Sequence, residues 1–292
     1  MKKLFLALLC AAVLLSGCQQ SETPARVAAT TLPVYEFTSR ICLGTPITVT
    51  RLVTEQVSCL HDYALNVRQV KAAEKAELII LSGAGLEEFM EDLLTGRESV
   101  DASAGVSLIC PEDHHGEDAH LHEAHRHDQD PHIWLSPKNA RIMVRNIRDG
   151  LSQKYPSYAT RFEENCASLL SDLDALQRYG ETQLASLTCR ELISFHDGFH
   201  YFADAFDLSI LEAVEEESGS EASAKELIHL IRLVRSHNLP AVFTEKSGSV
   251  SAADILSRET GCSVFSLDMA MAGDSYFDAM YHNIDTIKEA LQ

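Results

Sequence analysis

Short apolar segments alternate with segments of helical periodicity along most of the chain. Buried strands appear as short runs of apolar and β-branched residues, whereas amphipathic helices repeat their apolar residues every three or four positions. Alternating strands and helices predict parallel α/β sheets. Four strand-like runs fall in each half, which predicts two lobes. The expected strands are residues 26–31, 47–53, 77–82, 105–110, 191–195, 208–213, 241–245 and 263–268, and the clearest expected helices are 139–152, 224–236, 251–259 and 276–291.

One long amphipathic segment, residues 157–187, separates the two sets of strands. Its apolar residues recur at helical spacing, and as a helix it would run about 40 Å, long enough to cross from one lobe to the other. The pattern therefore predicts an α/β protein of two lobes, each a mostly parallel four-stranded sheet flanked by helices, joined by one long linker helix. The expected boundaries are 27–156 for the N-terminal lobe, 157–187 for the linker helix and 188–292 for the C-terminal lobe.

The N-terminus has the pattern of an export signal. Two lysines precede an apolar run over residues 4–15, which is too short to span a bilayer. The following "LLSGC" resembles a bacterial lipobox, so we expect a signal peptide over 1–17 and a lipidated tether over 18–26, anchored through Cys18. A plain signal peptide cut nearby is the alternative. Either reading places the mature protein outside the cytoplasm, and the first anchors it by lipid to a bacterial membrane, in the periplasm or at the cell surface.

The charge of the chain is strongly acidic. Its net charge of −19 becomes −21 once residues 1–17, with two lysines and no acids, are removed. Such a surface opposes nucleic-acid binding, which depends on neutralising phosphates with Lys and Arg, and suits a cationic ligand. Six cysteines remain after Cys10 and Cys18, and no C-x-x-C occurs among them, which argues against a cysteine-based zinc ribbon. Export permits disulfides, but spacing does not give their pairing.

Histidine is the residue type that points to a metal. The stretch "DHHGEDAHLHEAHRHDQDPHIW" (113–134) holds seven of the thirteen histidines, and imidazole is the commonest metal ligand among side chains. Four candidates, one of them at the end of that stretch, stand at or near strand ends, where open parallel sheets place their sites. Any one of them alone is more often structural, but matching positions in both halves favour a shared site. These four are His61, His132, His196 and Asp268.

Several longer motifs, spread over the mature chain, resemble those of a known protein family. They are "TLPVYEFTSRI" (31–41), "AELIILSGAGLEEFMEDLL" (76–94), "DPHIWLSPKNA" (130–140), "SFHDGFHYFADAFDL" (194–208), "KELIHLIRLVRSHNLPAVFTE" (225–245), "ETGCSVFSLD" (259–268) and "YHNIDTIKEAL" (281–291). With these motifs the chain resembles the zinc- and manganese-binding solute-binding proteins of bacterial ABC importers, the ZnuA and TroA group. The resemblance implies a metal held in the cleft between two α/β lobes, and delivery of that metal to a permease and its ATPase by a monomeric protein.

Carried over position by position, the resemblance implies His61 and His132 as ligands from the first lobe and His196 and Asp268 from the second. Manganese members generally have a carboxylate at the position of His196, so the histidine favours Zn²⁺, with Mn²⁺ possible. Three imidazoles and one carboxylate also form a compact tetrahedral site of the kind zinc prefers. His61 departs from the family pattern, because "CLHDYALNV" lacks the usual prolines, and Cys59 two residues earlier is an alternative ligand.

Two further residues accompany this ligand set. Glu245 ends the run "AVFTE", and His200 follows His196 by four residues. Each is expected either to orient a ligand imidazole by a hydrogen bond or to serve as an alternate ligand.

The histidine-rich loop, residues 113–129, has two readings. As an auxiliary site it would bind zinc weakly and pass it inward, or buffer excess metal, in keeping with the acidic histidine-rich insert that zinc members of the family commonly carry. The alternative is a solvated polar loop. Ordered binding inside it is disfavoured, because fixing a flexible segment costs roughly 1–2 kcal/mol per residue. Its histidines are His114, His115, His120, His122, His125 and His127.

Two other functions compete with metal import. "HDGFH" (196–200) echoes the H-E-x-x-H of zinc hydrolases, but it has an aspartate in place of the glutamate and a glycine inside the required helix. Four protein ligands would also leave no open position for a reactive water. A surface adhesin has only the expected lipid anchor in its favour. The sequence therefore favours a metal-binding importer component that is not an enzyme.

Overall fold

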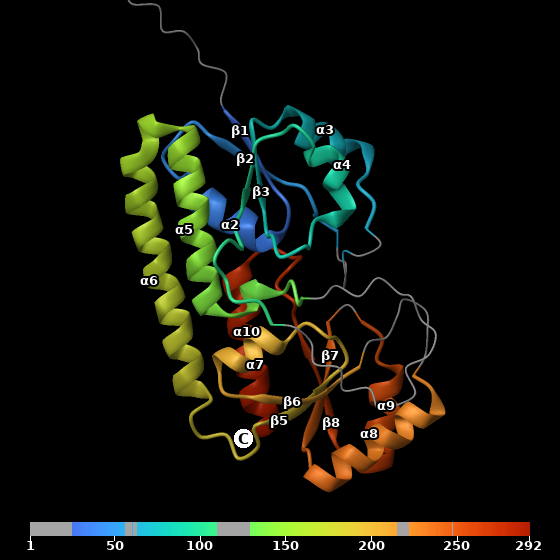
Figure 1. Ribbon diagram of the computed structural model, residues 1–292. Coiled ribbons are helices and arrows are strands. Elements are labelled where there is room, and N and C mark those ends of the chain that lie inside the picture. Colours follow the sequence, from blue (N-terminus) through green and yellow to red (C-terminus); the bar gives the residue numbers. More distant parts are fainter. Residues whose placement is uncertain (1–24, 56–59, 61–62, 110–128, 215–221, 247) are drawn as a thin grey trace, which may run out of the picture.

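The computed structural model describes residues 25–55, 60, 63–109, 129–214, 222–246 and 248–292. Within them lie two four-stranded sheets in which every pairing is parallel, with strand orders β2-β1-β3-β4 and β6-β5-β7-β8. The sheets lie one above the other in Figure 1. The two-lobe α/β fold expected from the hydrophobic pattern is confirmed. The strands are β1 (Arg26–Ala29), β2 (Thr48–Arg51), β3 (Leu78–Leu81), β4 (Ser99–Asp101), β5 (Glu191–Ser194), β6 (Ser209–Ala213), β7 (Ala241–Glu245) and β8 (Ser263–Leu267).

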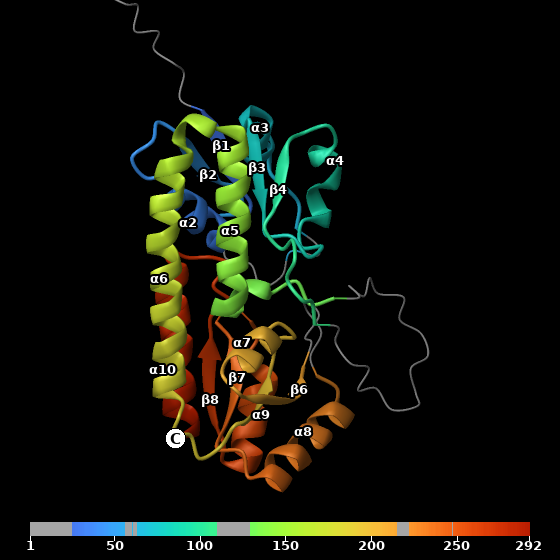
Figure 2. The ribbon, with the colours of Figure 1, turned by 60° about the vertical axis from the view of Figure 1, so that its left-hand side comes forward.

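Helices cover both faces of each sheet. Around the first sheet, α2 and α5 lie on one side and α3 and α4 on the other, while α10 and the pair α8 and α9 lie on opposite sides of the second (Figures 1 and 2). No described helix has both the length and the apolar character needed to cross a bilayer. The helices are α2 (Leu32–Ile41), α3 (Val67–Lys75), α4 (Glu91–Leu94), α5 (Pro137–Lys154), α6 (Ala159–Gln183), α7 (His200–Ala205), α8 (Ala224–His237), α9 (Ser251–Thr260) and α10 (Tyr276–Leu291), with short 3₁₀ turns at η1 (Glu88–Met90), η2 (Ile133–Leu135) and η3 (Pro156–Tyr158).

Local sequence signals fix several helix ends. Asn66 caps α3 and Ser223 caps α8, each through a reciprocal capping box with the residue three positions later. Gly261 ends α9 in the left-handed conformation that glycine adopts most readily. Asn238 ends α8 in the same conformation. The ends of these helices are therefore determined by capping residues close in sequence, which a search for hydrophobic periodicity does not detect.

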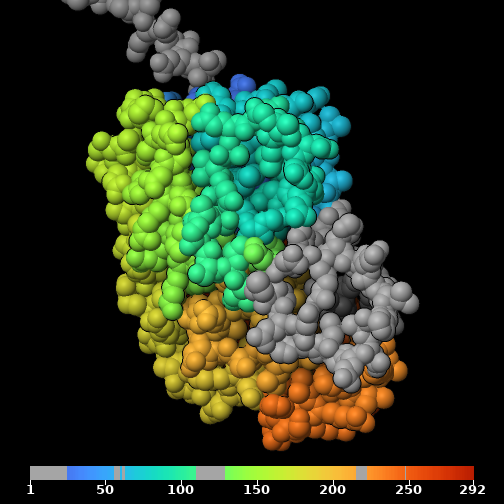
Figure 3. Space-filling model, in the orientation of Figure 1, coloured from blue at the N-terminus to red at the C-terminus, as the bar shows by residue number. Residues whose placement is uncertain are grey.

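The long helix α6 lies inside the expected 157–187 span. It packs along α5 and continues past the end of that helix, so that α6 runs beside both sheets on the left-hand side of Figures 1 and 3. The face that it buries consists of the apolar positions at helical spacing, including Phe162, Leu169 and Leu176. Gly180 is needed for close packing, because a Cβ there would lie 2.2 Å from the Phe206 ring. The glycine therefore admits a neighbouring ring in the final turns of α6.

One expected strand is wrong. The fourth strand of the first sheet is β4 at Ser99–Asp101, and residues 105–109 have no regular secondary structure. β4 is an edge strand with two exposed residues of three, so it carries no apolar run that periodicity could find. The apolar residues of 105–109 pack partly buried against the core instead, and the Ile109 N–H donates to the Tyr201 hydroxyl at 2.9 Å rather than to a strand.

Hydrogen bonds from buried aromatic residues connect the two halves of the chain. The indole Nε1–H of Trp134, on η2, donates to the Met269 carbonyl at 2.8 Å, and the Tyr276 hydroxyl donates to the Trp134 carbonyl at 2.8 Å. Trp134 and Tyr276 are fully buried. The segment that follows β8 is therefore tied directly to the segment that precedes α5, and both of these segments carry candidate ligands.

Candidate metal centre

His132 occupies a buried position immediately before η2. Its Nδ1 lies 2.8 Å from Asp130 Oδ1, which also accepts the backbone N–H of His132 at 2.9 Å. A carboxylate beside Nδ1 favours the tautomer in which Nδ1 carries the proton, which leaves the Nε2 lone pair available to a metal. The Asp130–His132 pair therefore has the carboxylate–imidazole arrangement that commonly supports metal-binding histidines.

His196 approaches His132 from the other half of the chain. It follows β5 by two residues, and the two imidazole ring centroids are 5.4 Å apart at 79°. Gly198 makes this approach possible, because a Cβ there would lie 2.8 Å from His196 Cδ2 and 2.9 Å from His132 Nδ1. The structure thus brings together two histidines that are 64 positions apart in the sequence.

Glu245 lies beside His196 at the end of β7. Its side chain is buried, and Oε2 is 3.6 Å from His196 Nδ1. Burial raises the pKa of Glu245 to about 7, opposed by the nearby His132 and reinforced by the negative Asp268. A buried carboxyl at this distance is placed to accept a hydrogen bond from a ligand imidazole or to supply an oxygen to a cation.

Asp268 follows β8 and is held in place through its backbone. The buried Asn283 accepts the Asp268 N–H and donates to the Asp268 carbonyl, both at 2.7 Å. On the side chain, Oδ1 accepts the Ala270 N–H at 2.8 Å, and Oδ2 accepts from Lys246 Nζ at 3.2 Å. The carboxylate is therefore positioned by fixed backbone, with an exposed ammonium as its cationic neighbour.

His200 pairs with Asp197 rather than with the other imidazoles. Its Nε2 lies 2.6 Å from Asp197 Oδ1, and this hydrogen bond raises the pKa of His200. Burial raises the pKa of Asp197, but the hydrogen bond and charge of His200 outweigh it and lower the pKa. The helix α7 begins only at His200, so residues 196–200 do not form the single helical face that a zinc hydrolase motif requires.

The remaining expected residues lie outside the described part of the chain. These are His61, the alternative ligand Cys59, the lipidation site Cys18, and His114, His115, His120, His122, His125 and His127 of the histidine-rich loop. Among the described residues, no three potential ligands are already gathered around one metal position. The structure shows two pairwise contacts, His132 with His196 and His196 with Glu245. The fourfold ligand set stays a prediction.

The two ends of the histidine-rich segment meet at a single tyrosine. Tyr201 accepts the Ile109 N–H and donates to the Asp130 carbonyl, both at 2.9 Å. The Asp130 N–H also donates to the Ile109 carbonyl at 2.9 Å. The residues on either side of the segment are thus joined directly, two positions before His132.

Sequence reasoning missed three residues that shape this centre. Asp130 stands in the quoted "DPHIW" motif, and a carboxylate two positions before a candidate ligand is a usable signal for an orienting partner. Gly198 lies inside "HDGFH", where its need for space depends on a ring from the other half. Asn283 lies fifteen residues after Asp268 on α10, and only the fold brings the two together.

Comparisons with known proteins identify the family of the chain. A family model described as "Zinc-uptake complex component A periplasmic", ZnuA, matches residues 27–290. The "Zinc-binding lipoprotein AdcA" of Streptococcus pneumoniae serotype 4 is 28% identical over 307 aligned positions, covering 99% of this chain and 61% of the relative. A metal-binding protein of Treponema pallidum is 27% identical over 302 positions, covering 97% of this chain and 95% of the relative.

A solved structure shows the same architecture. The crystal structure of ZnuA superposes with a TM-score of 0.78 and 26% sequence identity, covering 92% of this chain and 99% of the other. The chain spans about three fifths of the length of the pneumococcal relative but nearly all of the ZnuA structure. Because the family model covers almost everything after residue 26, the chain belongs to the ZnuA family of zinc-uptake complex components, whose members are solute-binding proteins and not enzymes.

Proposed function

We propose that this protein captures Zn²⁺ outside the cytoplasmic membrane and delivers it to the permease and ATPase of an ABC importer. The pairing of His132 with His196 carries the proposal, since their rings lie 5.4 Å apart and come from different halves of the chain. A metal bound by both imidazoles would connect the two halves. Membership of a zinc-uptake family and similarity to a relative named as a zinc-binding lipoprotein support zinc as the cargo.

The proposed ligands are His61, His132, His196 and Asp268, with the ion held in a cleft between the lobes 27–156 and 188–292. Three neutral imidazoles and one carboxylate suit tetrahedral Zn²⁺ better than Mn²⁺, which favours oxygen donors. Glu245 would orient His196 or replace a ligand oxygen. Mn²⁺ is the alternative cargo, and the presence of a histidine at position 196 argues for zinc.

Arrival of the metal would change the partner of Asp268. Its Oδ2 accepts from Lys246 Nζ at 3.2 Å. The lysine side chain is 62% exposed, and pairs of this kind contribute only about 0–1 kcal/mol. A divalent cation would therefore displace the ammonium at little cost.

The histidine-rich loop, residues 113–129, is assigned an auxiliary role. It precedes His132 directly, so zinc bound weakly there would be released next to the proposed site. Tight binding would not depend on it, because the loop supplies none of the four proposed ligands. Lipidation at Cys18 would keep the monomeric protein close to the permease in its membrane.

The test is a competition titration of Zn²⁺ and Mn²⁺ against a chelating dye, using the chain from residue 19 onward. We expect His132→Ala and His196→Ala each to weaken Zn²⁺ binding by more than the roughly 10–100-fold cost of losing an orienting partner. Deletion of 113–127 should leave the tight site nearly unchanged. His237→Ala is the matched control, because His237 pairs with Glu191 on the outer surface. Loss of tight binding on loop deletion, with His196→Ala unaffected, would refute the assignment.

A further inference from the structure

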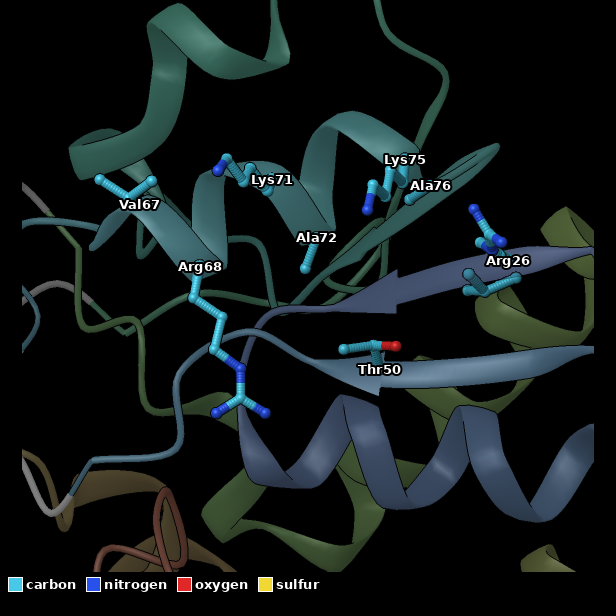
Figure 4. Close-up of a pocket in the computed structure, with 9 residues that line it drawn as sticks. Arg26, Thr50, Val67, Arg68, Lys71, Ala72, Lys75 and Ala76 are labelled. Carbon is cyan, nitrogen blue, oxygen red and sulfur yellow. The ribbon is translucent and has the colours of Figure 1, made fainter.

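A groove with basic walls lies between α3 and the edge of the first sheet formed by β1 and β2. Its volume is about 680 Å³. Figure 4 shows Arg68, Lys71 and Lys75 along α3, with Arg26 at the start of β1. The small side chains of Ala72 and Ala76 leave the floor open. Four cationic side chains thus line one hollow on a protein whose net charge is −19.

The helix concentrates these charges on one side. Arg68, Lys71 and Lys75 recur at intervals of three and four, so they share a helical face. All three are exposed, as is Arg26. Within the described residues none of the four side chains forms an ion pair, and the acid that α3 carries is Glu74. Among the described residues, the positive charge of the groove is therefore not neutralised by an ion pair.

The groove lies close to the start of the fold. Arg26 begins β1, which sits with β2 and α3 at the upper end of the molecule in Figure 1. Eight peptide steps separate Arg26 from Cys18, and a chain of that length spans at most about 28 Å. With Cys18 lipidated, as the proposed function has it, the start of the groove lies within about 28 Å of the lipid-bearing residue, so the tether lets the groove reach the lipid headgroups.

We propose that this basic groove binds the phosphate-bearing headgroups of anionic phospholipids in the anchoring membrane. The tether alone would hold the protein near the membrane without orienting it, whereas headgroup contacts would turn this end of the first lobe toward the bilayer. The overall negative charge does not prevent this, because charges farther away than about 8 Å are largely screened at physiological salt. Clusters of Lys and Arg near a membrane are attracted to anionic lipids in this way.

The test measures vesicle binding by the chain from residue 19 onward, which lacks the lipid but keeps every described helix and strand. Vesicles of pure phosphatidylcholine are compared with vesicles containing phosphatidylglycerol. The variant is Lys71→Gln with Lys75→Gln. Its matched control is Lys225→Gln with Arg232→Gln, which removes the same charge from exposed positions on α8 of the other lobe.

We expect binding only to the anionic vesicles, with a loss of about tenfold or more in the groove variant and less than about twofold in the control. Equal losses in both variants, or no preference for anionic vesicles, would overturn the proposal. Inorganic phosphate at matched ionic strength should not compete; competition would assign the groove to a soluble anion instead. Impaired zinc uptake in cells carrying the groove variant, with vesicle binding unchanged, would make the groove a protein contact and refute lipid binding.

Zinc titration of the same proteins separates this result from the proposed function. Neither double variant touches a proposed ligand, so Zn²⁺ affinity should be unchanged in both. A wild-type protein that binds vesicles but not zinc would refute zinc as the cargo without contradicting lipid binding by the groove. Measuring the mass of the mature protein extracted from membranes tests lipidation at Cys18 independently.

Discussion

Asp130 Oδ1 lies 2.8 Å from His132 Nδ1, and both side chains are buried. The carboxylate favours one orientation and one tautomer of the imidazole. The same oxygen accepts the backbone N–H of His132, so the ring and the main chain of this residue are fixed by one group.

Asp130→Asn tests this arrangement. The asparagine oxygen still accepts the hydrogen bond, but it carries no charge to make the imidazole a better donor. We expect Zn²⁺ affinity to fall by about 10–100-fold, measured by competition titration. Glu212→Gln is the control, because it neutralises a carboxylate paired with His229 on the exterior and should leave affinity unchanged. An unaltered affinity in the Asp130 variant would show that His132 does not depend on it.

Gly198→Ala should disturb the candidate metal site by steric crowding, without removing a ligand or a charge. The added methyl would lie within 3 Å of both His196 Cδ2 and His132 Nδ1, so the rings must separate. We expect Zn²⁺ affinity to fall about tenfold or more, the scale of losing an orienting contact. Gly180→Ala overpacks the Phe206 ring instead and should lower thermal stability while leaving affinity intact. Equal affinity losses in the two variants would point to general destabilisation.

Trp134→Phe removes a donor that joins the two halves. The Met269 carbonyl loses the 2.8 Å hydrogen bond from Trp134, and the smaller ring leaves a cavity in a fully buried position. We expect the free energy of unfolding to fall by about 2–4 kcal/mol in denaturant titrations. Tyr158→Phe, on a half-buried ring, should change it by less than about 0.5 kcal/mol. A change below 1 kcal/mol on this scale in the tryptophan variant would contradict a structural role for the bond.

The pH dependence of stability should report on the buried Glu87. Burial raises the pKa of Glu87 from 4.5 to about 7, although Thr30, Ser82 and Gly83 donate hydrogen bonds to it. Between these two values the folded state holds a proton that the unfolded chain has released, so stability falls as pH rises through this window. The full difference corresponds to about 3 kcal/mol.

Unfolding titrations at about pH 5 and pH 8 measure this slope. Glu87→Gln cannot titrate at this position, so the difference between the two pH values should shrink by about 2–3 kcal/mol even if the variant is less stable throughout. The Gln amide would face the Gly83 N–H, which lowers stability at both pH values alike. If the pH dependence of stability is the same in the variant and the wild type, a group other than Glu87 is responsible for it.

The hydrophobic pattern predicted most of the architecture because the relevant signals are local. Seven of the eight strands overlap apolar runs that the sequence pattern identifies. The helix α6 likewise buries the apolar residues that recur at helical spacing, among them Phe162, Leu169 and Leu176. The edge strand β4 was missed because two of its three residues face solvent. Edge pairing depends on the neighbouring strand rather than on the residues of the edge itself.

The arrangement of the candidate metal site could be derived from the sequence only in part, and its ligand set stays a prediction. His132, His196 and Asp268 follow from their places beside strand ends and from the family motifs. The contact between His132 and His196 depends on how the two halves pack. The same holds for the close approach of both rings to Gly198 and for the two hydrogen bonds between Asn283 and the Asp268 backbone. Contacts of this kind depend on the tertiary structure, so the spacing of residues within one segment of the sequence does not predict them.

Tyr201 closes the base of the histidine-rich insert by joining Ile109 to Asp130. Lengthening a loop whose ends are already joined adds little free energy, about 0.6 kcal/mol for each doubling. A change in the length of the insert should therefore cost little stability, while the imidazole of His132 just beyond the closure keeps its position.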